Sequence, residues 1–199
     1  MSPKMFIFIG RSGCGKGTQA RLLEEYLKKE DPGREIFYLE TGQRFRDFIK
    51  EDNLSSKLSL AISQEEKLQP SFLAVWMWSH LLIENLNGDE HIISDGTPRS
   101  IDEARVLDSA IRFYNRVPAY VVYLDVSRNW AEKRLQSRGR ADDQHKDGIK
   151  KRLDWFETSV LPAVEHLREH PEYLFLDING ERPMEEVHQE IIKKIELQK

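Results

Sequence analysis

Cysteine is nearly absent from this 199-residue sequence, which contains only Cys14. One cysteine cannot form a disulfide within the chain or a zinc site with several thiolate ligands. Long hydrophobic runs are absent as well. The first run, residues 5–9, ends at Gly10 and is too short for a signal peptide or a transmembrane helix. We therefore expect a cytoplasmic protein with no membrane partner.

An excess of positive charge is also missing. Lysine and arginine number 30 against 34 aspartates and glutamates, which gives a net charge of −4. Because binding to a nucleic-acid backbone requires a basic surface, we expect no nucleic-acid partner. Hydrophobic residues make up 39% of the chain and charged residues 32%, which is typical of a globular protein whose length fits one domain.

What the sequence does contain is a series of short apolar runs of strand length. They are continuous rather than alternating, which favours parallel strands that are buried on both faces of a sheet. The five runs cover residues 5–9, 36–39, 91–94, 120–124 and 173–176.

Helical patterns lie between most of these runs. They cover residues 16–30, 127–137, 146–169 and 183–196, and Pro183 suits a first helical turn. Strands that alternate with helices indicate right-handed βαβ units. The sequence therefore predicts an α/β protein with an open, five-stranded parallel sheet.

Two regions interrupt this alternation. Residues 41–88 contain three helical patterns without a strand, separated at Asn53 and at residues 69–70, and residues 138–147 are polar and charged. We expect an inserted helical subdomain in the first region and a short surface loop in the second. Both leave the sheet at the carboxyl ends of strands, where ligands bind in such folds.

Two pairs of side chains have simple structural interpretations. Trp76 and Trp78 are two residues apart and cannot share one helical face, so we expect both to be buried rather than to form a stacking platform. His166 and His170 are four residues apart, but no third metal ligand stands out in the sequence. We expect them to be an exposed pair on a helix.

A glycine-rich loop follows the first predicted strand. Its sequence over residues 10–19 is GRSGCGKGTQ, and Gly10, Gly15 and Lys16 match the spacing G-x-x-x-x-G-K. Such a loop directs backbone N–H groups and the start of a helix toward phosphate, and the lysine adds a positive charge. Gly17 stands where the motif usually has Ser or Thr, so Mg²⁺ should be held mainly by phosphate and water.

A second motif, DGTPRS, follows the third predicted strand over residues 95–100. The Asp95 carboxylate can anchor the water molecules around Mg²⁺. Gly96 permits close approach of a ligand, and Arg99 offers a forked donor for phosphate oxygens.

With these motifs in order, the sequence resembles the adenylate kinase family of nucleoside monophosphate (NMP) kinases. The segment ETGQRFR over residues 40–46 is similar to the family's S-T-G-D-x-x-R, and DGTPRS is similar to D-G-F-P-R-T. The resemblance covers almost the whole chain. It implies a single three-layer P-loop kinase domain over residues 1–199, with a helical NMP-binding insertion over 41–70 and a short lid over 138–147.

The resemblance also implies roles for individual residues. It assigns ATP binding to Gly13, Cys14, Gly15, Lys16, Gly17, Thr18 and Arg134. It assigns NMP binding to Thr41, Arg46, Leu68, Gly96, Arg99 and Glu103. It assigns catalysis to Lys16, Arg99, Arg138, Arg140 and Arg152, with Asp142 and Asp143 fixing the lid arginines. It also implies Mg²⁺ as the cofactor, ATP and AMP or another NMP as the substrates, and a monomeric protein.

Three positions depart from the family pattern. Gln43 replaces Asp, Thr97 replaces Phe, and Glu103 replaces the Gln that reads the base of the acceptor. An ionised Glu only accepts hydrogen bonds, whereas a Gln also donates. Glu103 therefore suits the amino group of adenine, but it suits guanine or cytosine equally well.

The expected reaction is reversible transfer of the γ-phosphoryl group from MgATP to AMP, which gives two ADP. The alternative acceptors are UMP, CMP and GMP. A different class of function is a catalytically silent nucleotide-binding module, against which Lys16, Asp95 and Arg99 argue. A GTPase-like switch would need D-x-x-G and N-K-x-D motifs, and neither occurs in a suitable place.

Overall fold

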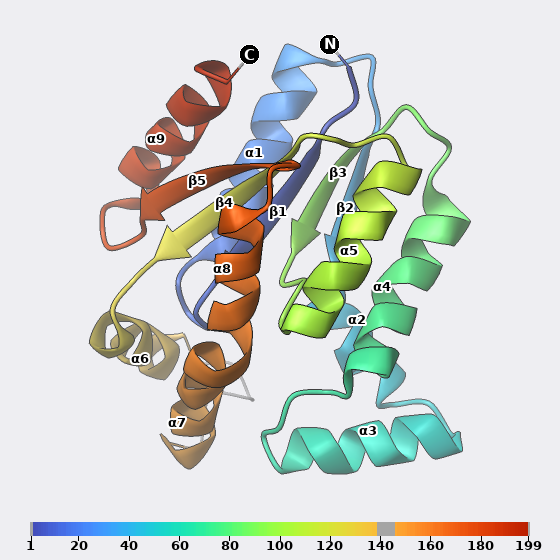
Figure 1. Cartoon of the computed structure of the whole chain (residues 1–199). Helices are drawn as coiled ribbons and strands as arrows, with labels where there is room; N and C mark the ends of the chain where they lie inside the picture. The colour runs from blue at the N-terminus through green and yellow to red at the C-terminus, as the bar shows by residue number, and fades with distance from the viewer. Residues whose placement is uncertain (1, 139–145, 199) are drawn as a thin grey trace.

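The computed structural model describes residues 2–138 and 146–198, and its centre is a parallel sheet (Figure 1). The strand order is β2-β3-β1-β4-β5, and every neighbouring pair is parallel. The strands are β1 (Met5–Gly10), β2 (Ile36–Glu40), β3 (His91–Asp95), β4 (Ala119–Asp125) and β5 (Tyr173–Asn179). The predicted open, five-stranded parallel sheet is confirmed.

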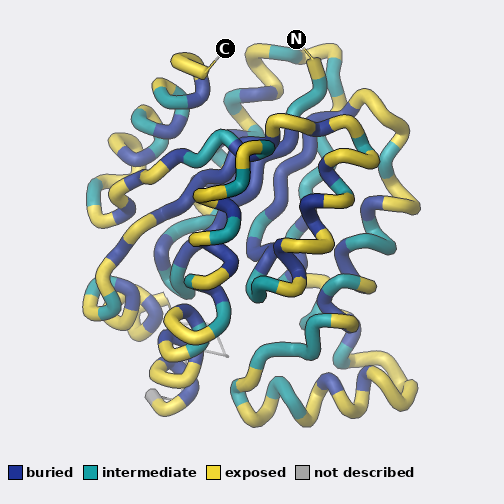
Figure 2. The backbone as a smooth tube through the Cα atoms, viewed as in Figure 1, coloured by how far each residue is buried: buried dark blue, intermediate teal, exposed yellow. Residues whose placement is uncertain are grey.

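Helices cover both faces of the sheet, which makes three layers. Every residue of β1 is buried, and alternate side chains enter opposite cores, as the pleat of a strand requires. Phe6 and Phe8 pack with helices α1 (Lys16–Glu30) and α9 (Met184–Glu196). Met5 and Ile7 pack on the other face, in a core that also contains Trp78, Leu107 and Leu167. Figure 2 shows the buried strands between these layers.

The predicted helical region between β2 and β3 is confirmed. It contains α2 (Thr41–Phe48), α3 (Leu54–Gln64) and α4 (Ser71–Asn85). Asn53 caps α3: its side chain accepts a hydrogen bond from the Ser56 N–H, and the Ser56 hydroxyl accepts one from the Asn53 N–H. Figure 1 places α3 apart from the sheet, below the carboxyl ends of the strands.

The structure adds a helix that the sequence analysis did not predict, α5 (Ile101–Phe113), between β3 and β4. It packs with α4 and with α8 (Leu161–Glu169) on the second face of the sheet. Helix α6 (Arg128–Ser137) follows β4 as predicted.

The predicted helix over 146–169 is three segments in succession. Helix α7 (Lys146–Trp155) continues into a π-helical segment, Phe156–Val160, and then into α8. Pro162 lies in the first turn of α8. Proline lacks an N–H, and its ring crowds the carbonyl group four residues earlier, here that of Thr158, so a regular α-helical turn is disfavoured across this position.

Two expectations about side-chain pairs are wrong. Trp78 is buried, but Trp76 is 47% exposed and stacks on His80. Helix α4 is apolar on most of its surface, so hydrophobicity alone does not identify its buried face. His166 and His170 are not an exposed pair, because only about a fifth of each side chain is accessible and both contact Asp108.

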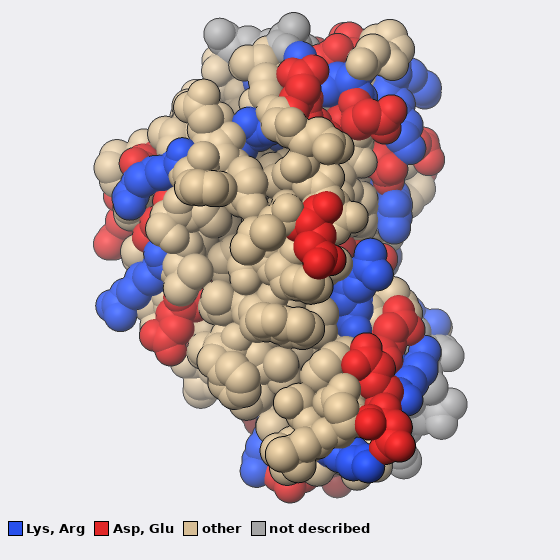
Figure 3. All heavy atoms as spheres, turned by 90° about the vertical axis from the view of Figure 1, so that its right-hand side faces the viewer, with Lys and Arg blue, Asp and Glu red and all other residues tan. Residues whose placement is uncertain are grey.

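The outer face of α4 also exposes Phe72 and Ile83. Figure 3 looks onto this side of the molecule and shows a surface with few charged side chains, apart from an acidic group near its middle, and more charged side chains toward its margins. No described helix combines the length and the apolar character that crossing a membrane requires.

Candidate functional site

The loop between β1 and α1 has the shape that phosphate binding needs. Gly15 stands immediately before α1 with φ of 97°, a left-handed conformation that favours glycine. A Cβ on Gly13 would lie 2.9 Å from Leu135 Cγ, so packing against α6 also requires glycine there. The Cys14 side chain is buried in the core, which leaves its backbone as the part able to contact a phosphate.

The Lys16 ammonium group lies across this loop. Its Nζ donates hydrogen bonds to the carbonyl oxygens of Gly10 (2.8 Å) and Arg11 (2.9 Å). These contacts hold the side chain over the loop. A bound phosphate would replace the carbonyl oxygens as the partner of the Lys16 ammonium group.

Asp95, at the end of β3, lies beside the first turn of α1. A Cβ on Gly17 would lie 3.0 Å from Asp95 Oδ2, so even a methyl group would crowd the carboxylate. The Tyr38 hydroxyl donates to the same oxygen over 3.4 Å. Burial raises the pKa of Asp95, and the charge of Lys16 opposes this shift. A carboxylate beside the loop with no hydroxyl at Gly17 fits a Mg²⁺ held by phosphates and water.

Arg99 occupies the loop after β3. Its Nε donates to the Gly96 carbonyl oxygen over 2.8 Å, which orients the guanidinium group. A Cβ on Gly96 would lie 3.0 Å from Arg99 Nη2, so glycine leaves room for this arrangement. Burial lowers the pKa of Arg99, while the charges of Glu103 and Asp95 oppose the shift.

Arg46 on α2 is held by polar neighbours. Its Nη2 donates to Gln43 Oε1 over 2.8 Å and lies 3.2 Å from Glu40 Oε1. Gln43 in turn donates through its amide nitrogen to Asp47. Gln43 replaces the Asp of the family pattern and cannot form an ion pair with Arg46. Its amide group instead bridges Arg46 and the Asp47 carboxylate.

These groups line one cleft of about 830 Å³ at the carboxyl ends of the strands. Of the residues predicted to form the site, the cleft is lined by Gly13, Gly15, Lys16, Gly17, Thr18, Thr41, Arg46, Leu68, Asp95, Gly96, Arg99, Glu103, Arg134, Arg138 and Arg152. Arg140, Asp142 and Asp143 lie outside the described residues. The arrangement can hold two phosphate-bearing ligands against one set of cations.

Comparisons with known proteins agree with this geometry. The family model for adenylate kinase matches residues 8–172. Adenylate kinase 1 of Nostoc sp. is 30% identical over 185 residues, which cover 93% of this chain and 95% of that protein. The adenylate kinase of Corynebacterium glutamicum is 28% identical over 189 residues, which cover 95% of this chain and 97% of that protein.

The chain belongs to the adenylate kinase family. It is therefore a phosphotransferase that acts on a phosphate acceptor, and the predicted family and enzyme class are confirmed.

In this adenylate kinase family member, the described arginines that precede and follow residues 139–145 in the sequence differ in their surroundings. Arg134 on α6 is exposed and lies over the Trp130 ring, with Cζ 5.0 Å from the ring centroid. Arg138 immediately follows α6 and lines the cleft. Arg152 on α7 is buried, and its Nε lies 3.6 Å from Glu66 Oε2.

Glu66 is a residue that the sequence analysis missed. It follows α3 with φ of 58°, and its carboxylate lies so close to Gly148 that a Cβ there would be 2.8 Å from Glu66 Oε1. Lys151 Nζ also donates to the Glu65 carbonyl oxygen over 3.1 Å. The segment after α3 and helix α7 thus meet across the cleft, a contact between residues far apart in sequence that no local pattern indicates.

Glu103 has a structural role as well as a place in the cleft. Ser100 caps α5 by accepting from the Glu103 N–H over 3.3 Å, and Glu103 Oε1 accepts from the Arg99 N–H over 3.3 Å. Burial raises the pKa of Glu103, and the charge of Arg99 opposes this shift. The S-x-x-E pattern over residues 100–103 could have predicted both the cap and the helix that follows it.

Proposed function

We propose that this adenylate kinase family member transfers the γ-phosphoryl group of MgATP to AMP, reversibly, to give two ADP. The main support is that Lys16 and Arg99 line one cleft. Lys16 begins the helix that follows the loop after β1, and Arg99 lies in the loop after the neighbouring strand β3. Phosphoryl transfer depends on bringing two polyphosphates together and balancing their charge, and this cleft offers cations from both sides.

In this mechanism the loop between β1 and α1 binds the ATP phosphates, with Lys16 at the β and γ oxygens. Arg46 and Arg99 hold the phosphate of the acceptor. Arg138 and Arg152, with Arg140, stabilise the charge on the transferring group. Asp95 would hold Mg²⁺ through water, and the ion would neutralise charge on the ATP phosphates.

Two segments would exclude water during transfer. Residues 41–70 form the proposed acceptor subdomain, and residues 138–147 form the proposed lid. We propose that their closing and opening limits turnover, since ATP must be shielded from hydrolysis at each cycle. The proposed enzyme is cytoplasmic, as expected from its single cysteine and short apolar runs, and the family resemblance implies a monomer.

One observation favours a second candidate, the same transfer with GMP or CMP as acceptor. Glu103 is 4% exposed and lines the cleft where the family pattern has Gln. As a carboxylate it accepts hydrogen bonds from the N1–H and N2 amino groups of guanine or from the amino group of cytosine.

A single assay distinguishes these functions. The purified protein is mixed with MgATP and, separately, with AMP, GMP, CMP or UMP, and diphosphate formation is followed by ³¹P NMR. Arg99→Ala is expected to lower the rate by about 10³-fold or more, by analogy with other phosphate-stabilising arginines. The control is Arg105→Ala, which removes an exposed arginine of the neighbouring helix α5 outside the cleft lining.

The adenylate kinase reaction is supported if AMP is the one acceptor of the four that gives rapid ADP formation. This activity should be lost in Arg99→Ala and kept in Arg105→Ala. If another nucleotide is preferred, that nucleotide is the acceptor, and the proposed mechanism of transfer is unchanged. Absence of transfer to all four acceptors while ATP still binds would overturn the proposed reaction.

A further inference from the structure

A cluster of two histidines and one aspartate lies away from the nucleotide cleft. Asp108 is on α5, His166 is in the last turn of α8, and His170 immediately follows α8. Next comes β5, which begins at Tyr173, so the cluster lies near the amino end of β5, whereas the phosphate-binding loop follows the carboxyl end of β1. None of its three residues lines the cleft.

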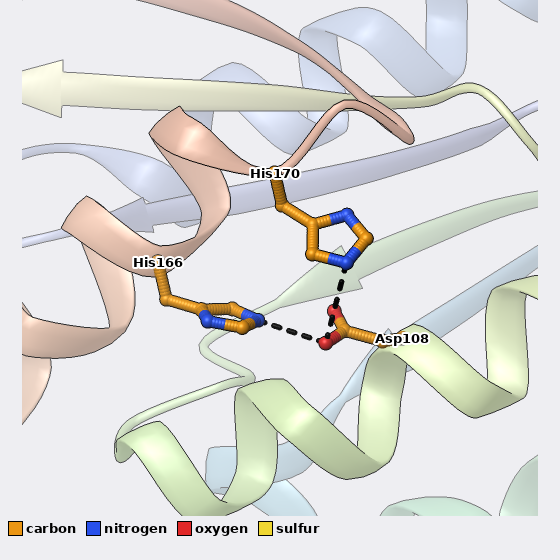
Figure 4. Close-up of side chains that lie close together, drawn as sticks. All are labelled: Asp108, His166 and His170. Atoms are coloured by element: carbon orange, nitrogen blue, oxygen red, sulfur yellow. Dashed lines mark hydrogen bonds and ion pairs between the residues drawn. The ribbon is translucent and has the colours of Figure 1, made fainter.

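The three side chains converge on one point (Figure 4). His166 Nε2 lies 2.8 Å from Asp108 Oδ2, and His170 Nε2 lies 3.8 Å from the same oxygen. One potential ligand atom from each residue lies within 4.8 Å of the others. Two imidazole nitrogens thus face a single carboxylate oxygen, an arrangement that a cation between them would satisfy more fully than one hydrogen bond does.

We propose that Asp108, His166 and His170 form a binding site for a divalent transition-metal ion of the zinc class. Zinc binds imidazole nitrogen and carboxylate oxygen at about 2.0–2.2 Å, which places ligand atoms roughly 3.4 Å apart in a tetrahedron. The two histidines stand at the rim, with 22% and 21% of their side chains exposed. Small side-chain movements bring the ligands to this spacing, and water takes the fourth position.

The neighbours of the cluster support ligation. Asp108 is 7% exposed, and its second oxygen accepts a hydrogen bond of 2.7 Å from the Tyr173 hydroxyl. This bond fixes the carboxylate so that Oδ2 faces the histidines. Outer partners of this kind orient metal ligands and strengthen binding.

His170 has a carboxylate on its other side. Glu172 Oε2 lies 3.9 Å from His170 Nδ1, and Arg112 Nε orients that carboxylate through bonds of 2.8 and 2.7 Å. Metal binding through Nε2 leaves the proton on Nδ1, and the Glu172 carboxylate can then accept a hydrogen bond from this N–H group. The Glu172 N–H, now 3.4 Å from Nδ1, gives up that weak contact.

The chemistry of the ligand set selects the ion. Two imidazoles and one carboxylate suit Zn²⁺, Co²⁺ or Ni²⁺, whereas Ca²⁺ and Mg²⁺ prefer ligand sets of oxygen alone. Because Asp108 and the two histidines come from different helices, a bound ion joins α5 to the end of α8. Its expected effect is greater stability without a change in the chemistry of the cleft.

The test is titration of the chelator-treated full chain, free of nucleotide and Mg²⁺, with Co²⁺ and then Zn²⁺. We expect one Co²⁺ per chain, with visible absorption typical of histidine ligation, and displacement by Zn²⁺. His166→Gln and His170→Gln are each expected to lower the affinity at least tenfold, about the loss caused by removing even an outer partner. The control, His80→Gln, changes a histidine on α4 that lies outside the cluster.

A second measurement is thermal unfolding. Zn²⁺ at about one hundred times its Kd should raise the Tm by roughly 5–10 °C in the wild-type protein and in His80→Gln. The kinase rate of His166→Gln without zinc should equal that of the wild type, which shows that the variant folds. Equal Co²⁺ affinity in all variants, or no binding below about millimolar metal, would overturn the proposal and leave a hydrogen-bonded cluster.

Discussion

The hydroxyl oxygens of Thr41 and Thr97 lie 2.6 Å apart, and both side chains are almost completely buried. Thr41 is the first residue of α2, and Thr97 lies in the loop that carries Arg99. This hydrogen bond joins the start of the helical insertion to the end of β3. It also gives a physical reason for Thr97, since the phenylalanine of the family pattern could not form it.

Thr97→Val should therefore destabilise the protein. The substitution keeps the shape of the side chain but leaves the buried Thr41 hydroxyl without this partner, at a cost of about 1–3 kcal/mol in the free energy of unfolding. Urea unfolding measures this cost. The double variant Thr41→Val/Thr97→Val removes both polar groups and should be more stable than the sum of the single effects allows. Strict additivity of the two single effects would contradict the proposed coupling.

Gly17→Ala should reduce activity without reducing stability. Alanine is the better helix former by about 1 kcal/mol, but its Cβ would lie 3.0 Å from Asp95 Oδ2 and displace the carboxylate. We expect kcat with MgATP to fall about tenfold or more, because small misplacements at a reacting centre are costly.

The matched control for this prediction is Gly33→Ala, since a Cβ on Gly33 meets no atom within 4 Å. Steady-state rates over a range of Mg²⁺ concentrations, together with urea unfolding, separate the two effects. Full activity and an unchanged Mg²⁺ dependence in Gly17→Ala would show that the crowding of Asp95 is unimportant.

Glu66→Gln should make the cleft easier to open. The substitution removes the charge that pairs with Arg152 across the cleft. Arg152 is buried, but the Glu66 side chain is 23% exposed and the contact is long at 3.6 Å, so water screens the pair. A screened ion pair contributes up to about 1 kcal/mol, which corresponds to a change of up to about fivefold in a rate or equilibrium. Because we propose that opening limits turnover, kcat should rise by up to that factor and KM should rise with it.

Stopped-flow measurement of phosphoryl transfer beside the steady-state rate checks this mechanism. Glu65→Gln is the control, since the Glu65 carboxylate pairs with Lys67 and Lys151 of the neighbouring helix donates to the Glu65 carbonyl oxygen, which the substitution keeps. Identical kcat values for the two variants would show that the contact between Glu66 and Arg152 does not control turnover.

The sequence predicts the sheet and the phosphate-binding loop well because both depend on local signals. Continuous apolar runs mark the buried strands, and the spacing of Gly10, Gly15 and Lys16 identifies the loop. The helix α5 also had a local signal, since Ser100 and Glu103 form an S-x-x-E pattern. That helix was therefore predictable, although the sequence analysis did not predict it.

Other features depend on contacts between distant segments. Asp108 meets His166 across 58 positions of the chain, and Glu66 likewise meets Arg152 from a distant part of the sequence. Trp76 shows a different limit: its helix is apolar on most sides, so the hydrophobic pattern cannot show which face is exposed. Such properties follow from packing rather than from periodicity.

The position of Glu103 predicts a pH dependence of stability. Burial raises the pKa of its carboxyl group above the ordinary value, so the folded state favours the protonated form. The favourable contribution of the protonated Glu103 carboxyl group to the free energy of unfolding is fully present below the ordinary pKa. It is lost as the pH rises through the raised pKa. Glu103→Gln does not titrate, so its stability relative to the wild type should increase as the pH rises above about 4.3.

Urea unfolding from about pH 5 to about pH 8 measures this difference, and the raised pKa of Asp95 cancels because both proteins contain it. Glu132→Gln, at an exposed position of α6, is the control substitution.

The titration of Glu103 should also affect the choice of acceptor. Protonated Glu103 can donate as Gln does, so the ratio of kcat/KM for AMP to that for GMP should fall with rising pH in the wild type. In Glu103→Gln the ratio should stay constant and be about tenfold higher at alkaline pH, the value of one hydrogen bond of about 1.4 kcal/mol. A ratio that does not change with pH in either protein would place the base out of reach of Glu103.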